Sequence, residues 1–167
     1  MVGEVATARK ALEFEAPATS PEAPRTRLAM PRLLSLYLLT ALVFFAIDLL
    51  WLGVVAAGFY RRQMGELMRP EVRWDAAFTF YAIYLVGILV FAVLPGLEVG
   101  SLGRTVALGA FFGFVAYATF DLTALAVIRG FPGGMVAVDL IWGTFLTGSV
   151  AAAGYGFGRW LGVGAGT

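Results

Sequence analysis

Four long apolar runs constrain the fold of this chain more than any other feature. They cover residues 33–57, 76–94, 105–128 and 135–161. As a helix rising about 1.5 Å per residue, each run is long enough to cross a hydrocarbon core about 30 Å thick. Prolines and glycines punctuate the runs at Pro31, at Pro95-Gly96 and between Gly130 and Gly134. We therefore expect an all-α polytopic membrane protein whose four transmembrane helices form a bundle.

Composition supports a membrane protein and excludes several kinds of chemistry. The 167 residues are 60% apolar and 14% charged, whereas soluble domains are about half apolar and about a quarter charged. The chain has no cysteine and no histidine, which excludes disulfides, thiolate chemistry, imidazole metal sites and Ser-His-Asp catalysis. We expect no metal and no cofactor. The net charge of +1, without a basic stripe, gives no reason to expect nucleic acid as a partner.

The first thirty residues differ in character from the rest of the chain. They contain four glutamates, three prolines and few large apolar side chains. Such a segment cannot bury enough apolar surface to offset the entropy lost on ordering. We therefore expect a disordered tail over residues 1–30 and a four-helix transmembrane domain over residues 31–162.

The connection from Gly58 to Trp74 is the longest between two runs. Its apolar side chains recur at helical spacing, with arginines between them. This pattern favours a short amphipathic helix at the membrane interface after the first transmembrane helix. A solvated linker is the alternative.

Basic residues flank the two sides of the membrane almost equally. Four spans place both termini on one side. That side has Arg25, Arg27, Arg32, Arg104 and Arg159, and the other has Arg61, Arg62, Arg69, Arg73 and Arg129. Arg9 and Lys10 raise the count to seven against five, so the positive-inside rule favours cytoplasmic termini.

Three aspartates lie inside the apolar runs: Asp48, Asp121 and Asp139. An ionised carboxylate at mid-bilayer costs about 3 kcal/mol on insertion scales, so such residues usually face the bundle interior and mark a site or a pathway. Asp48 and Asp121 lie in the later part of two runs with the same direction, and Asp139 lies early in a run with the opposite direction. All three should therefore lie in the same half of the bilayer, on the side of the Gly58–Trp74 connection.

Aromatic and hydroxyl side chains are expected at a similar depth. Trp51 follows Asp48 by three residues, and Trp142 follows Asp139 by three, so each pair shares a helix face. Tyr84, Tyr117 and Thr123 complete the candidate ligand- or proton-binding set of Asp48, Asp121, Asp139, Trp51, Trp142, Tyr84, Tyr117 and Thr123. The runs contain no basic residue near these carboxylates, which must then take up a proton or bind a cation. Alternatively, protonated aspartates only form hydrogen bonds between helices.

Four short motifs in a fixed order carry a family resemblance. They are Asp-Leu-Leu-Trp-Leu-Gly at 48–53, Phe-Tyr-Arg-Arg-Gln at 59–63, Tyr-Ala-Thr-Phe-Asp-Leu-Thr at 117–123 and Val-Asp-Leu-Ile-Trp-Gly-Thr at 138–144. With them, residues 33–162 resemble a family of predicted bacterial membrane proteins called domain of unknown function 2177. The resemblance implies a four-helix, multipass protein of the bacterial inner membrane. It implies no established activity and therefore no catalytic residue.

Three functions are compatible with these features. The leading hypothesis is binding or transport of a small cationic or amphiphilic molecule, or of protons, by the aspartate and aromatic cluster. Because four helices make a thin wall around a pathway, transport would require a homodimer in the lipid bilayer. The second hypothesis is a membrane-embedded, lipid-modifying enzyme or its subunit, with aspartates as general acid and base. The third is a membrane scaffold or assembly factor whose aspartates specify helix packing.

Overall fold

Four apolar helical spans make up the protein in a computed structural model that describes residues 25–164. The first span is α2 (Arg25–Leu50), continued by a π-helical turn, η1 (Trp51–Val55). The second combines α4 (Trp74–Ile88), a second π-helical turn, η3 (Leu89–Val93), and α5 (Leu94–Glu98). The third is α6 (Leu102–Val127) and the fourth is α7 (Gly133–Trp160). The predicted all-α polytopic bundle is confirmed.

The first helix begins at Arg25, earlier than the boundary at residue 31 that the sequence predicted. Most of the tail predicted for residues 1–30 lies outside the described residues. Residues 25–30 belong to α2, which contains Pro31 and is not opened by it.

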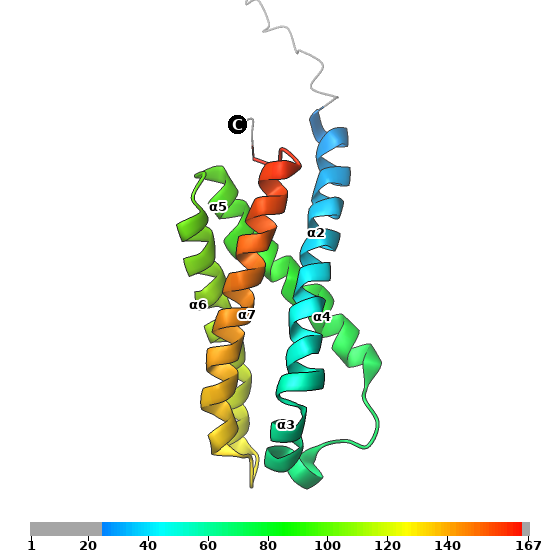
Figure 1. The fold of residues 1–167 in the computed structure, drawn as a ribbon, viewed down its shortest axis with the longest axis vertical. Coiled ribbons are helices and arrows are strands. Elements are labelled where there is room, and N and C mark those ends of the chain that lie inside the picture. The colour runs from blue at the N-terminus through cyan, green and yellow to red at the C-terminus, as the bar shows by residue number, and fades with distance from the viewer. Residues whose placement is uncertain (1–24, 165–167) are drawn as a thin grey trace, which may run out of the picture.

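The spans are arranged so that α2, α6 and α7 run along the long axis of the molecule (Figure 1). Helix α7 lies against both α2 and α6. The span from α4 to α5 crosses behind them obliquely, and the first half of α4 runs away from α6 (Figure 1). The short helix α3 (Ala57–Met64) lies at the same end as the connection between α6 and α7 (Figure 1).

Small residues bring α6 and α7 together. A Cβ added to Gly109 would lie 3.0 Å from the Thr147 carbonyl oxygen, and one added to Gly113 would overlap the Gly143 carbonyl. These glycines therefore allow backbone to approach backbone, which is the main source of helix association where lipid removes the hydrophobic driving force. The close packing of α6 on α7 at these two glycines lies within one chain.

Pro95 does not end the second span, although the sequence suggested that it would. A proline within a helix lacks an N–H donor, and its ring clashes with the carbonyl four residues earlier, here that of Phe91. The π-helical turn η3 surrounds Phe91 and accommodates this disruption, so the helix continues to Glu98.

The largest apolar cluster is on the side of the bundle nearer the termini. Leu36 and Phe44 from α2, Ile88 from α4, and Leu146 and Val150 from α7 are almost fully buried in it. This packing holds three spans together at one end and leaves polar side chains to gather nearer α3.

Helix α3 confirms the amphipathic segment predicted after the first span. Its Phe59, Tyr60 and Met64 pack against a small cluster from the facing ends of α6 and α7 that includes Met135. Its arginines are exposed. The apolar face of α3 therefore covers the end of the bundle.

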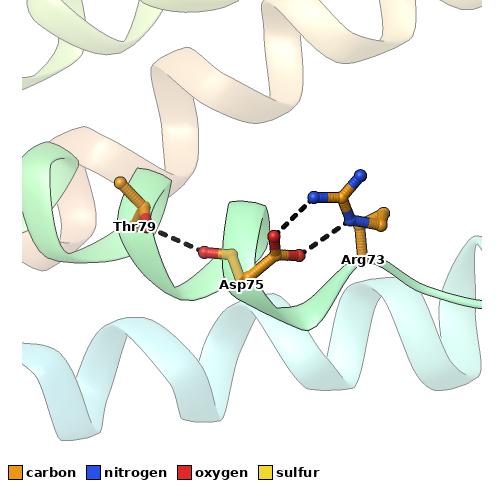
Figure 2. A network of polar contacts seen from close by, with 3 residues as sticks. All are labelled: Arg73, Asp75 and Thr79. Atoms are coloured by element: carbon orange, nitrogen blue, oxygen red, sulfur yellow. Dashed lines mark hydrogen bonds and ion pairs between the residues drawn. The ribbon is translucent and has the colours of Figure 1, made fainter.

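The beginning of α4 is fixed by a local polar network, shown in Figure 2. The Arg73 guanidinium donates to both carboxylate oxygens of Asp75, at 2.9 and 2.5 Å, and the Thr79 hydroxyl donates to the Asp75 carbonyl at 2.8 Å. Asp75 also places negative charge at the positive end of the helix dipole. The pair is exposed, so its role is to define the start of the helix more than to stabilise the protein.

Candidate functional site

One cavity of about 480 Å³ brings the three intramembrane aspartates together. Asp48 comes from α2, Asp121 from α6 and Asp139 from α7. The remaining wall is mostly aromatic and includes Tyr60, Phe80, Tyr81, Tyr117, Phe120 and Trp142. The convergence expected from the directions of the spans therefore occurs, and we call this space the carboxylate cavity.

Asp48 is held by donors from two other spans. Its carboxylate accepts a hydrogen bond from the Tyr81 hydroxyl at 3.1 Å and a long one from the Trp142 indole N–H at 3.5 Å. Tyr81 is on α4 and Trp142 on α7, so Asp48 joins three spans. Its side chain is buried and has a partner for each oxygen.

Asp139 is held by a chain of donors that passes through α3. The Tyr60 hydroxyl donates to one carboxylate oxygen of Asp139 and accepts from the Trp51 indole N–H at 3.3 Å. Burial first, and then the bond to Asp139, raise the pKa of the Tyr60 phenol above its ordinary value, so it is protonated at neutral pH and remains a donor. The Trp51 ring stacks on Trp142, with ring centroids 4.2 Å apart and planes 9° from parallel.

Asp121 has no such support. It is 0% exposed, and neither of its carboxylate oxygens receives a hydrogen bond from any donor in the described part of the chain. Its neighbour is the Asp139 carboxyl, close enough for a hydrogen bond between the two if one carries a proton. Two ionised carboxylates in low dielectric repel each other. This pair therefore requires either a shared proton or a positively charged ligand.

No basic side chain among the described residues lines the carboxylate cavity. Among residues 30–164 the only ion pair is the exposed one between Arg73 and Asp75. Within the same residues, no group of three acidic side chains has the spacing to bind a metal ion. The cavity is thus an acidic site inside the membrane, walled by aromatic rings.

The cavity opens sideways between two helices. Phe80 on α4 and Phe120 on α6 both line it, yet they are 51% and 61% exposed. Their exposed surface faces the region where lipid chains would lie, because both residues are within apolar spans. Phe80 and Phe120 therefore stand between the cavity and the hydrocarbon layer.

Five of the eight residues predicted for the site line the cavity: the three aspartates, Tyr117 and Trp142. Trp51 lies behind the wall, where it supports Trp142 and Tyr60. Tyr84 is buried one helical turn beyond Tyr81 and shares a 2.7 Å hydrogen bond with Thr147 on α7.

Thr123 lies on the outer surface of α6. Its hydroxyl donates to the backbone carbonyls of Thr119 and Phe120, at 3.0 Å for the latter. The structure therefore does not bring Thr123 together with the carboxylates. Threonine readily forms such bonds to the preceding helical turn, and a sequence position alone does not exclude them.

Tyr60 and Tyr81 also line the cavity and were not among the residues predicted for the site. Tyr81 was indicated by its position in the first turns of the second span, at the depth of the aspartates, and it precedes Tyr84 by three residues. Tyr60 was indicated only as part of an amphipathic helix. Its role depends on α3 folding back onto α7, which helical periodicity does not predict.

Fold and site together define a polytopic α-helical membrane protein with a cavity lined by carboxylates and aromatic rings. Residues 33–156 match the model of a family described as predicted membrane protein (DUF2177), and the chain belongs to this family. The resemblance carried by the four motifs is thereby confirmed. No curated protein and no solved structure matches the chain.

Proposed function

We propose that the protein binds a small organic cation, such as a protonated or quaternary amine, in the carboxylate cavity. The observation that carries this proposal is Asp121, a fully buried carboxylate with no donor, which faces a second carboxylate. A cation beside Asp121 and Asp139 would offset their repulsion, and no basic side chain among the described residues lines the cavity to compete for that role.

The aromatic wall supports the same ligand class. Organic cations bind over the faces of tryptophan and tyrosine through the ring quadrupole, and most strongly where water is excluded. Trp142, Tyr81 and Tyr117 all line the cavity. Its volume of about 480 Å³ lies within the range typical of small-molecule sites.

Proton exchange would accompany binding. Without a ligand, Asp121 and Asp139 share a proton. A cation that binds beside them favours two ionised carboxylates, so the proton leaves as the ligand arrives. This exchange links ligand occupancy to pH and is the step on which proton-coupled transport would depend. Transport would also require a second copy of the chain, since four helices make a thin wall.

The test is native mass spectrometry of protein in nanodiscs of zwitterionic lipid, titrated with tetraethylammonium. The site variant replaces Asp48, Asp121 and Asp139 by asparagine, and the matched control is Asp75→Asn, an exposed acid outside the cavity. Saturable binding should occur in the wild type and in Asp75→Asn and be lost in the triple variant. Equal binding by all three would refute the proposal, and a folded triple variant that differs only in stability would favour the scaffold hypothesis.

We further propose that this membrane is the inner membrane of a bacterium and that both termini are cytoplasmic. The count of seven basic residues against five on the two sides supports cytoplasmic termini. The bacterial inner membrane is what the resemblance of the four motifs implies. A C-terminal fusion to a fluorescent protein that folds only in the cytoplasm should fluoresce. A fusion to periplasmic alkaline phosphatase should be inactive.

A further inference from the structure

A second, wholly apolar groove lies along α4 and continues into η3, on the side that faces α6. Its volume is about 340 Å³, and it follows one face of the helix through Phe80, Ile83, Gly87, Val90 and Phe91, with Phe112 of α6 opposite. We call it the α4 groove. From Phe80 to Phe91 the helix rises about 16 Å, at about 1.5 Å for each of eleven residues.

The floor of the α4 groove is an unbroken series of aromatic rings. Phe80 stacks on Tyr84 with centroids 5.2 Å apart, Tyr84 on Phe112 at 5.4 Å, and Phe112 contacts Phe91 at 5.6 Å. Gly87 makes this arrangement fit, because a Cβ there would come within 2.6 Å of the Phe112 ring. The groove is thus shaped by specific packing and is more than a gap between two lipid-facing helices.

The α4 groove and the carboxylate cavity share a wall. Phe80 lines both of them, and it is half exposed at the lateral opening of the cavity. A molecule with its charged group beside Asp121 and Asp139 therefore has an apolar path that begins at Phe80 and ends near Phe91. The two spaces together match a cationic head followed by one hydrocarbon chain.

We infer that the ligand is a single-chain cationic amphiphile that enters from the bilayer between α4 and α6, with its head in the carboxylate cavity and its chain in the α4 groove. This inference rests on the proposed function. An ordinary phospholipid fits poorly, because its phosphate would meet three carboxylates with no basic residue in the cavity to neutralise it. A small hydrophilic cation would leave the groove unused. A dodecyl chain is close to the length of the groove.

Photolabelling in zwitterionic nanodiscs tests the path of the chain. Two dodecyltrimethylammonium probes carry a diazirine, one beside the head and the other at the chain end, and labelled residues are located by peptide mass spectrometry. The head-proximal probe should label α4 near Phe80, and the chain-end probe should label η3 near Val90 and Phe91. An excess of unlabelled dodecyltrimethylammonium should abolish both labels.

Two tryptophan variants make the result specific to the groove. Val90→Trp fills the far end of the α4 groove from a position that is half exposed. Val106→Trp is the matched control, since Val106 is also partly exposed but faces a different groove, between α6 and α7. The chain-end label near Phe91 should be lost in Val90→Trp and kept in Val106→Trp, while both variants keep the head-proximal label.

The outcomes separate this inference from the proposed function. A saturable head-proximal label, with a chain-end label that is scattered over the bundle or unaffected by Val90→Trp, would overturn the inference and leave the cation site intact. A loss of dimer in Val90→Trp without a change in labelling would assign the groove to a second copy and also overturn it. Labels of both probes that persist in the triple asparagine variant would refute the proposed function itself.

Discussion

Leucine at position 121 should stabilise the protein, whereas leucine at position 48 should destabilise it. Both substitutions replace a buried aspartate by an apolar side chain in the wall of the same cavity. The space available to the larger side chain is therefore similar, and any cost of crowding largely cancels in the comparison. The sign of each effect then depends on whether removal of the carboxylate leaves a hydrogen-bond donor without an acceptor.

The expected magnitudes follow from the hydrogen bonds. Asp121→Leu removes a buried group that receives no donor, which relieves about 1–3 kcal/mol, and loses at most one proton-mediated bond to Asp139 worth about 1 kcal/mol. The net effect with that bond lost is a stabilisation of up to about 2 kcal/mol. Asp48→Leu leaves the Tyr81 hydroxyl unpaired at a cost of about 1–3 kcal/mol. The Trp142 bond adds little at 3.5 Å.

The assay is equilibrium unfolding in bicelles by added dodecyl sulfate, followed by tryptophan fluorescence. The unfolding midpoint of Asp121→Leu should lie above that of the wild type and that of Asp48→Leu below it. In the same preparations, Asp121→Leu should lose cation binding, as expected of a residue kept for function at a cost in stability. If Asp121→Leu destabilised as strongly as Asp48→Leu, Asp121 would have a structural partner and the reasoning would fail.

Three further predictions use the same unfolding assay. Gly113→Ala should destabilise by about 1–3 kcal/mol, because its methyl group overlaps α7. Gly103→Ala on the same helix should instead stabilise the protein by up to about 1 kcal/mol. A Cβ added there meets no atom of the other described elements within 4 Å. The pKa of Tyr60 is higher in the folded state than in the unfolded state, so the neutral phenol contributes fully to stability below about pH 10. This contribution is lost as the pH rises through the folded-state pKa. Tyr60→Phe should therefore reduce the decline of the unfolding midpoint above pH 10, and an unchanged slope would contradict this role. A double-mutant cycle with Trp51→Ala and Trp142→Ala should give a coupling of about 0.5–1.5 kcal/mol for the stacked rings, and a coupling near zero would mean that the stack adds nothing to stability.

The fold and the position of the carboxylates could be predicted from the sequence because both depend on long-range constraints of the bilayer. A span must be apolar over its whole length, and consecutive spans must alternate in direction. Those two facts alone place Asp48, Asp121 and Asp139 at one level, and the cavity contains all three.

The direction in which each side chain points could not be predicted in the same way. Thr123 is two residues from Asp121, so on a helix it faces away from the cavity, although its depth is the same. The π-helical turn η1 adds a second difficulty, because it changes the helical phase where Trp51 begins it and before α3 returns Tyr60 to the bundle. The depth of a residue in its span therefore predicts where in the bilayer a site lies, but the packing of the helices decides which side chains point into it.

The repeated Asp-Leu-x-Trp strings explain why only one aspartate lacks a donor. Each indole supports the carboxylate of the other span. The Trp142 indole on α7 donates to Asp48, and the Trp51 indole in η1 donates to the Tyr60 hydroxyl, which in turn donates to Asp139. The stacked rings keep the two strings together. The partial string at Asp121 has no tryptophan and gains no donor. Two carboxylates are thus fixed by the protein, and the third is left for a proton or for the positive charge of a ligand.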